Sequence, residues 1–350
     1  MRKYLNKGLL YEWFTASKMP ILIGLVTWGF IARRILGSYI SIKRDDIAGA
    51  ESNHFMAADL GDYFILGVIF LAIYSFASGV SKRNTTMFLC SGPFTKRQIK
   101  INELICLLIT LGLFIIMYIY IAVTIYVKNN ELMSIVNWYP QVILIEVVRF
   151  MLFGIIGILL MIEIDSLFSN SIIAYFGMIA LGVATIAIII KCRTIVSYFG
   201  SYGATMDKIF GNIIYGNSKR LSILFFGGSY HSDDSGTIFK GIIFSIVIIG
   251  IMLLTFNVLE KRAKLETTNK IFSCKANENM IVVYLSIGIG SFINREITMI
   301  SINNTIGRFG RIPTYTNTDL MMRFAIDVIS IAVITLISYK LFKKILKVVG

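Results

Sequence analysis

Two side chains of opposite charge, Glu146 and Arg149, lie inside an apolar run that covers residues 142–162. Three positions apart on a helix, they share one face and can neutralise each other. A lone charge at the centre of a membrane costs about 2.5–3.5 kcal/mol on insertion scales, so pairing or a watery surface is expected. The spacing suits either a substrate pathway or a structural ion pair near the outer interface, and the ion pair is the simpler interpretation.

Other groups that could do chemistry are sparse. His231 lies beside Asp233 and Asp234, which is a weak cue for a metal, and His54 falls in a polar loop. The four cysteines show neither CxxC nor Cys/His spacing, so we predict no metal site and no disulfide framework. The motifs GxxxxGK[ST], HExxH and GxSxG are absent from the sequence, so we expect no ATP hydrolysis, no hydrolase and no cofactor on this chain.

A basic segment, residues 81–103 (SKRNTTMFLCSGPFTKRQIKINE), joins two long apolar runs. Its cations favour the cytoplasmic side of a membrane. Gly92 and Pro93 break the chain, and Thr95 can cap a short helix that starts near Lys96. A short amphipathic helix there would offer a contact for a soluble partner, and a solvated loop without further function is the alternative.

These groups must be positioned by membrane helices, because 56% of the 350 residues are hydrophobic and only 15% are charged. Soluble domains carry about 25% charged residues. The net charge is +14, and the basic residues are clustered at the ends of apolar runs, where they can contact anionic lipid head groups. The basic residues do not form one tract with interleaved aromatic residues, so lipids and not nucleic acid are the expected partner. The fold class is an all-α, polytopic helical membrane protein.

Eight apolar runs are predicted to span the membrane, and a parity argument from the basic C-terminus places both chain ends in the cytoplasm. An interfacial elbow helix is expected before Pro20, which can start the first span. Arg33 and Arg34 lie along that span and must reach outward or face protein. The predicted spans are residues 20–40, 64–80, 104–127, 142–162, 171–190, 241–259, 280–293 and 324–342.

The domain organisation follows from these spans. Small residues in the fifth run form one helical face, which permits close packing within the chain or at a dimer seam; they are Ala174, Gly177, Ala180 and Ala184. The expected parts are an elbow helix (1–18), a six-span core (19–260) with an external loop at 191–240, a cytoplasmic linker (261–279), and a C-terminal transmembrane pair with a basic tail (280–350).

The chain resembles the permease subunits of bacterial ABC-type exporters, in the class whose membrane and ATPase subunits are separate chains. Three segments carry the resemblance: LLYEWFTASKMPILIGL at the elbow, FLCSGPFTKRQIKINEL in the basic segment, and SLFSNSIIAYFGMIAL at the start of the fifth span. The similarity covers residues 1–260. Residues 261–350 depart from the six-span core and resemble only the family's longer Gram-positive members, which have an extra helical pair.

The resemblance implies a transporter in the bacterial plasma membrane. Two permease chains, identical or related, would dock two ABC ATPase subunits, and ATP and Mg would bind in those partners. The cargo would be amphipathic or hydrophobic: a peptide such as an antimicrobial peptide, an antibiotic, or a lipid-linked molecule. The coupling helix that the ATPase pushes would consist of Pro93, Phe94, Thr95, Lys96, Arg97 and Gln98.

Two other classes of function stay open at this stage. A stand-alone channel or secondary transporter would depend on Glu146 and Arg149. A membrane-embedded enzyme or sensor scaffold would hold its essential residues in the long external loop at 191–240.

Overall fold

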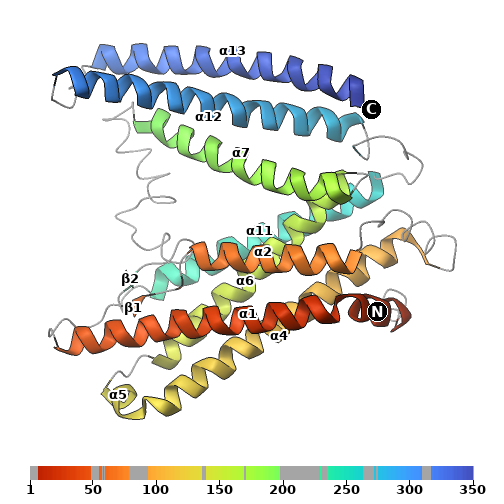
Figure 1. Cartoon of the computed structure of the whole chain (residues 1–350), viewed down its shortest axis with the longest axis vertical. Helices are drawn as coiled ribbons and strands as arrows, with labels where there is room; N and C mark the ends of the chain where they lie inside the picture. The colour runs from red at the N-terminus through yellow and green to blue at the C-terminus, as the bar shows by residue number, and fades with distance from the viewer. Residues whose placement is uncertain are drawn as a thin grey trace. The chain divides into compact units, whose positions relative to one another are not determined.

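The chain is built almost entirely from long helices, as a computed structural model shows (Figure 1). The structure describes residues 7–48, 55–56, 58, 60–78, 94–135, 139–168, 171–197, 229–230, 235–262, 272, 275–309 and 317–349. Its long helices are α1 (Lys7–Ala48), α2 (Leu60–Ser78), α4 (Lys96–Lys128), α6 (Tyr139–Leu167), α7 (Ser171–Ser197), α11 (Ser235–Arg262), α12 (Lys275–Phe309) and α13 (Asn317–Val349). The shorter elements are α5 (Asn130–Ile135), and β1 (Phe55–Met56) paired antiparallel with β2 (Ser229–Tyr230).

Seven of these helices are long and apolar enough to cross a membrane, and α2 contributes a shorter apolar helix, Asp62–Ala77. Large apolar side chains lie exposed along them, for example Phe30 (71%) and Leu254 (69%). Water would make such faces unfavourable, whereas lipid covers them. The protein is therefore an all-α, multi-pass helical membrane protein, as the sequence predicts.

The N-terminal elbow is not a separate helix. Residues 7–18 form the first turns of α1, which continues for 42 residues through Pro20. A proline inside a helix removes one hydrogen bond, but it need not end the helix when the surrounding turns are held by other contacts. Leu9, Trp13 and Ser17 are buried, and the Ser17 hydroxyl donates to the Trp13 carbonyl at 2.8 Å. Ile21, directly after Pro20, is also buried, so packed side chains lie on both sides of the expected break.

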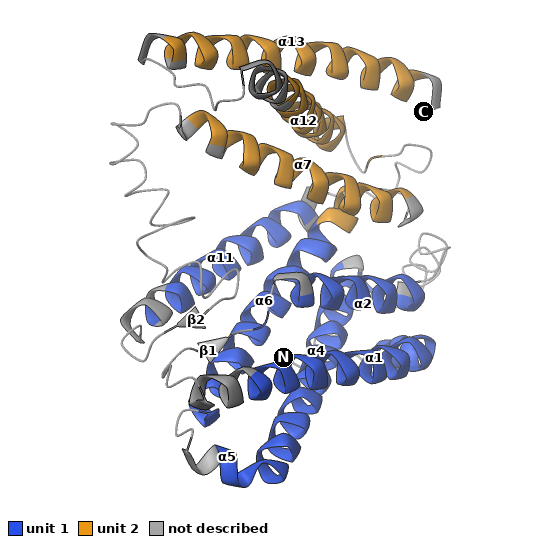
Figure 2. Ribbon diagram, turned by 60° about the vertical axis from the view of Figure 1, so that its left-hand side comes forward, with its two compact units in different colours: residues 1–163, 211–261 blue, residues 164–210, 262–350 orange. Residues whose placement is uncertain are grey.

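One compact unit covers residues 1–163 and 211–261 and contains α1, α2, α4, α6 and most of α11 (Figure 2). Within it α1 packs against α2 and α4. Gly24 permits this approach, because a Cβ atom there would lie 2.9 Å from Ile69 Cγ2. Trp28 is buried between these helices and α6, with its ring centroid 5.0 Å from Phe150 and 6.4 Å from Tyr118.

The second unit covers residues 164–210 and 262–350, and α12 lies between α7 and α13 within it (Figures 1 and 2). A Cβ atom at Gly288 would lie 2.4 Å from Ala184 Cβ, so the α7 and α12 backbones meet closely. The Thr185 and Tyr284 hydroxyls form a hydrogen bond at 2.7 Å. Of the predicted small-residue face, Ala174, Gly177 and Ala184 are buried and Ala180 is exposed. At Ala184 this face packs within the chain.

The predicted six-span core is therefore wrong in one respect, because α7 belongs with α12 and α13. Ala184 of α7 packs against Gly288 of α12 and Lys191 of α7 pairs with Asp327 of α13, which sequence order does not reveal. The seventh predicted span, residues 280–293, is also longer than expected: it lies within α12, whose segment Lys275–Thr298 is long and apolar enough to cross a membrane.

Candidate functional site

The basic segment enters α4 through a capped helix start. The Thr95 hydroxyl accepts a hydrogen bond from the Gln98 backbone N–H at 3.3 Å, and the Thr95 N–H donates to Gln98 Oε1 at 2.9 Å. This reciprocal capping box confirms the predicted cap at Thr95. Pro93 lies outside the residues that the structure describes.

A separate short coupling helix is not found after this cap. Helix α4 continues from Lys96 to Lys128 for 33 residues. The chain contains no glycine or proline between Thr95 and Gly112, so nothing in this part of the sequence ends the helix once it has begun. The predicted segment is the first turn of a membrane helix, and any force on it acts directly on α4.

The first turn of α4 divides into an exposed and a buried side. Thr95 and Arg97 are exposed, Phe94 and Gln98 are half-buried, and Ile99 is buried. Lys96 occupies the first helical position, and its side chain is outside the described part of the structure. The exposed side therefore offers a cation and a hydroxyl beside a partly accessible phenyl ring.

Two polar contacts attach the first turns of α4, up to Glu103, to neighbouring helices. Lys100 Nζ lies 2.8 Å from Glu103 Oε2, and the Tyr74 hydroxyl of α2 donates to the same oxygen at 3.3 Å. Arg97 Nη2 donates to Asn257 Oδ1 of α11 at 3.5 Å. A displacement of the turn would consequently be felt by both α2 and α11.

The intramembrane pair on α6 is closed and fully buried. Arg149 Nη1 lies 2.8 Å from Glu146 Oε1, and the two side chains are 1% and 5% exposed. Glu146 Oε2 accepts from the Tyr63 hydroxyl at 3.2 Å and from the Ala58 N–H at 3.4 Å. Arg149 Nη2 donates to the Ala58 carbonyl at 3.1 Å, and its guanidinium lies 5.1 Å from the Tyr63 ring centroid. The shared face is confirmed, and the pair fastens α6 to the chain at the start of α2.

A second buried pair was missed by sequence reasoning. Lys191 Nζ of α7 lies 2.6 Å from Asp327 Oδ2 of α13, with side chains 2% and 7% exposed. The Thr298 hydroxyl of α12 donates to Asp327 Oδ1 at 3.4 Å, so α7, α12 and α13 meet here. The available signal was Lys191 directly after one predicted span and Asp327 inside another, but these positions are 136 residues apart.

Two further ion pairs join neighbouring helices. Arg34 of α1 lies 2.6 Å from Asp62 of α2, and Lys343 of α13 lies 2.5 Å from Glu278 of α12. These contacts resemble the buried pairs in holding neighbouring helices together, but they are more exposed.

Within the described residues, no cluster of three or more His, Cys, Asp or Glu side chains could hold a metal ion. Cys106 is a buried thiol and Cys192 an exposed one. The weak metal cue at His231, together with His54, lies outside the described residues, as does most of the 191–240 loop.

Comparisons of the chain with models of known protein families, with curated proteins and with solved structures find no match. The resemblance to exporter permeases is therefore carried by the sequence motifs alone.

Proposed function

We propose that this chain is the transmembrane subunit of an ATP-driven ABC-type exporter, and that the first turn of α4 is where a separate ATPase subunit docks. Two such permease chains, identical or paired with a related chain, would form the transporter in a bacterial plasma membrane, with both chain termini in the cytoplasm. The partner would hydrolyse ATP with Mg. The cargo would be an amphipathic or hydrophobic peptide, antibiotic or lipid-linked molecule.

The observation that supports this proposal most strongly is the capped, exposed start of a helix that is longer than a membrane. At 1.5 Å per residue, the 33 residues of α4 extend about 50 Å, whereas a hydrocarbon core is about 30 Å thick. The polar first turns can therefore project into the cytoplasm as a rigid continuation of the span. Arg97 and Thr95 are exposed on this projection, where a partner can reach them.

The contacts of the first turn supply a route for mechanical coupling. Lys100 and Glu103 hold Tyr74 of α2, and Arg97 reaches Asn257 of α11. When ATP binding closes the partner subunits, pressure on the α4 start would shift α2 and α11 with it. A transporter needs such a unit with two arrangements whose balance the partner can bias.

The Glu146–Arg149 pair favours this function over a self-sufficient secondary transporter. Both side chains are nearly inaccessible, and they contact each other, Tyr63 and the Ala58 backbone. Transport through this site would require breaking the ion pair between Glu146 and Arg149 and the hydrogen bonds of both side chains to Ala58. The pair is better suited to holding α6 in place.

The test is affinity purification of the tagged full-length chain in a mild detergent, with the bound proteins identified by mass spectrometry. The unsubstituted chain should retain a soluble ATPase subunit in stoichiometric amount. Arg97→Glu should weaken that association roughly tenfold or more, since charge reversal at a docking contact costs affinity. Phe94→Ala should uncouple ATP hydrolysis from transport.

Lys347→Glu is the matched control, because Lys347 is an exposed cation at the predicted cytoplasmic end of α13. It should leave the association unchanged. If the intact, folded chain retains no ATPase, or if Arg97→Glu and Lys347→Glu behave alike, the assignment of the docking turn is wrong. Glu146 and Arg149 would then be the residues to test for a self-sufficient transporter.

A further inference from the structure

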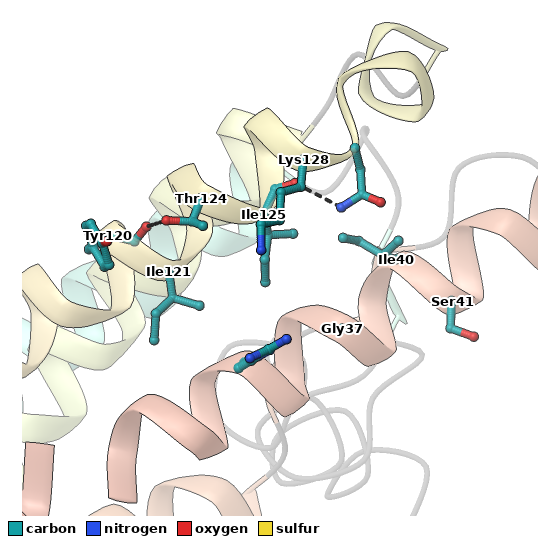
Figure 3. Close-up of a pocket in the computed structure, with 10 residues that line it drawn as sticks. Gly37, Ile40, Ser41, Tyr120, Ile121, Thr124, Ile125 and Lys128 are labelled. Carbon is teal, nitrogen blue, oxygen red and sulfur yellow. Dashed lines mark hydrogen bonds between the residues drawn. The ribbon is translucent and has the colours of Figure 1, made fainter. Parts of the chain in front are cut away.

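A groove of about 440 Å³ opens between α1 and α4 near the C-terminal end of α4 (Figure 3). The two helices pack closely where Gly29 of α1 approaches the Met117 side chain of α4. The groove is lined by residues that follow these positions in both helices. Its polar lining includes Arg33, Ser41, Thr124 and Lys128, and Ile121 and Ile125 supply apolar wall. The groove thus combines cations with an apolar surface, and no carboxylate lines it in the described part of the chain.

Arg33 differs from three other cations in the apolar helices. Arg34, Arg149 and Lys191 each lie within 2.8 Å of a carboxylate oxygen. Arg33 has no carboxylate partner among the described residues, although it lies in the α1 span well before that helix ends at Ala48. A guanidinium in a membrane span is costly unless it is paired, faces water or reaches the interface, and a counter-charge beside exposed Arg33 would lower that cost.

Lys128 adds a second cation at the other wall of the groove. It lies in the last turn of α4, where a cation also offsets the partial negative charge of the helix end. Arg33 is far from the C-terminal end of α1, so its charge does not offset the partial negative charge of that helix end. The groove therefore keeps a net positive charge.

We infer that this groove binds an anionic phospholipid, with the phosphate of the head group between Arg33 and Lys128. Guanidinium and ammonium groups are the side chains that hold phosphate most strongly. The hydroxyls of Ser41 and Thr124 line the same space and can contact the head group. The isoleucine side chains and the exposed ring of Tyr120 suit an acyl chain that leaves the head group along α4. A small soluble anion has no apolar part that would contact the isoleucine side chains, whereas a phospholipid has acyl chains that would.

Gly37 makes the inference testable without removing a charge. It lies on the groove, and a Cβ atom placed there would meet no atom within 4 Å. Leucine at this position is compatible with the helix, because glycine is the poorer helix former. Gly37→Leu should therefore fill the groove and leave α1 folded. Gly67 of α2 is a matched control, since a Cβ there also meets open space and Gly67 is not on the groove.

The experiment is native mass spectrometry of the full chain in mild detergent, titrated with phosphatidylglycerol or with phosphatidylcholine. The chain should retain phosphatidylglycerol in preference. Arg33→Gln combined with Lys128→Gln should weaken that binding roughly 10- to 30-fold, from the usual contribution of a cation at a lipid surface. Gly37→Leu should displace the lipid, and Gly67→Leu should not.

Lys18→Gln combined with Lys275→Gln removes the same charge from exposed sites off the groove, and it should change binding by less than about twofold. Equal loss in the two double variants would overturn the inference, because it would show unspecific attraction. Equal binding of the two lipids, or unchanged binding in Gly37→Leu, would also overturn it. Displacement of the lipid by inorganic phosphate would assign the groove to a soluble anion instead. Helicity measured by circular dichroism establishes that each variant is folded.

Discussion

Glu146–Arg149 and Lys191–Asp327, two buried ion pairs among the described residues, are held in different ways. Glu146 and Arg149 lie on one helix, and their remaining polar atoms contact Tyr63 and both backbone groups of Ala58. Lys191 and Asp327 lie on different helices, and Asp327 also accepts a hydrogen bond from the Thr298 hydroxyl of a third helix. If Arg149 were replaced, the Glu146 carboxylate would keep its hydrogen bonds from Tyr63 and Ala58. If Asp327 were replaced, the Lys191 ammonium would lose its carboxylate partner. The number of remaining partners, and not burial alone, should decide how costly a broken pair is.

The largest effect is expected from Asp327→Leu. This change leaves the Lys191 ammonium buried without its carboxylate, which costs about 3–5 kcal/mol when a buried pair is broken. Denaturant titration in mixed micelles would measure the loss in free energy of unfolding. The double variant Lys191→Met with Asp327→Leu should recover most of it, because neither charge then remains. A double variant as unstable as the single one would mean that the charge is not the cause.

A smaller effect is expected from Arg149→Met. The Glu146 carboxylate loses its cation but keeps hydrogen bonds from Tyr63 and from the Ala58 N–H, so we expect a loss of about 2–3 kcal/mol. The same titration measures it, with Glu146→Gln as a conservative comparison. A loss equal to or above that of Asp327→Leu would remove the proposed difference between the two pairs.

The smallest effect is expected from Tyr63→Phe, which sharpens the comparison by removing one supporting hydroxyl. Its hydrogen bond to Glu146 is 3.2 Å long and joins α2 to α6. The loss should be about 1 kcal/mol alone. Combined with Arg149→Met it should exceed the sum of the single losses, because the second change then removes a contact on which the first variant depends. Simple additivity in this double-mutant cycle would show that the two contacts act independently.

Local patterns allowed several features to be predicted. The hydrophobic runs predicted an all-α membrane protein, and seven of the eight predicted spans fall within long helices, while residues 64–78 of the remaining one lie in α2. The Thr95 cap and the shared face of Glu146 and Arg149 were correct because they involve residues three positions apart. The elbow helix and the short coupling helix were wrong as separate elements. Proline and charged residues suggested that these short helices would end before the membrane spans begin. Instead, α1 continues past the packed Trp13 into its span, and α4 continues without interruption after Thr95.

The sequence by itself determined the class of the protein and the helices, because apolar length and helix capping act over a few neighbouring residues. The tertiary structure decided which helices belong together. Helix α7 joins α12 and α13 through Ala184 against Gly288 and through Lys191 with Asp327, while Arg33 is left facing a groove. Such pairings depend on contacts between residues far apart in the chain, and an apolar helix is compatible with many neighbours until a small residue or a buried charge selects one.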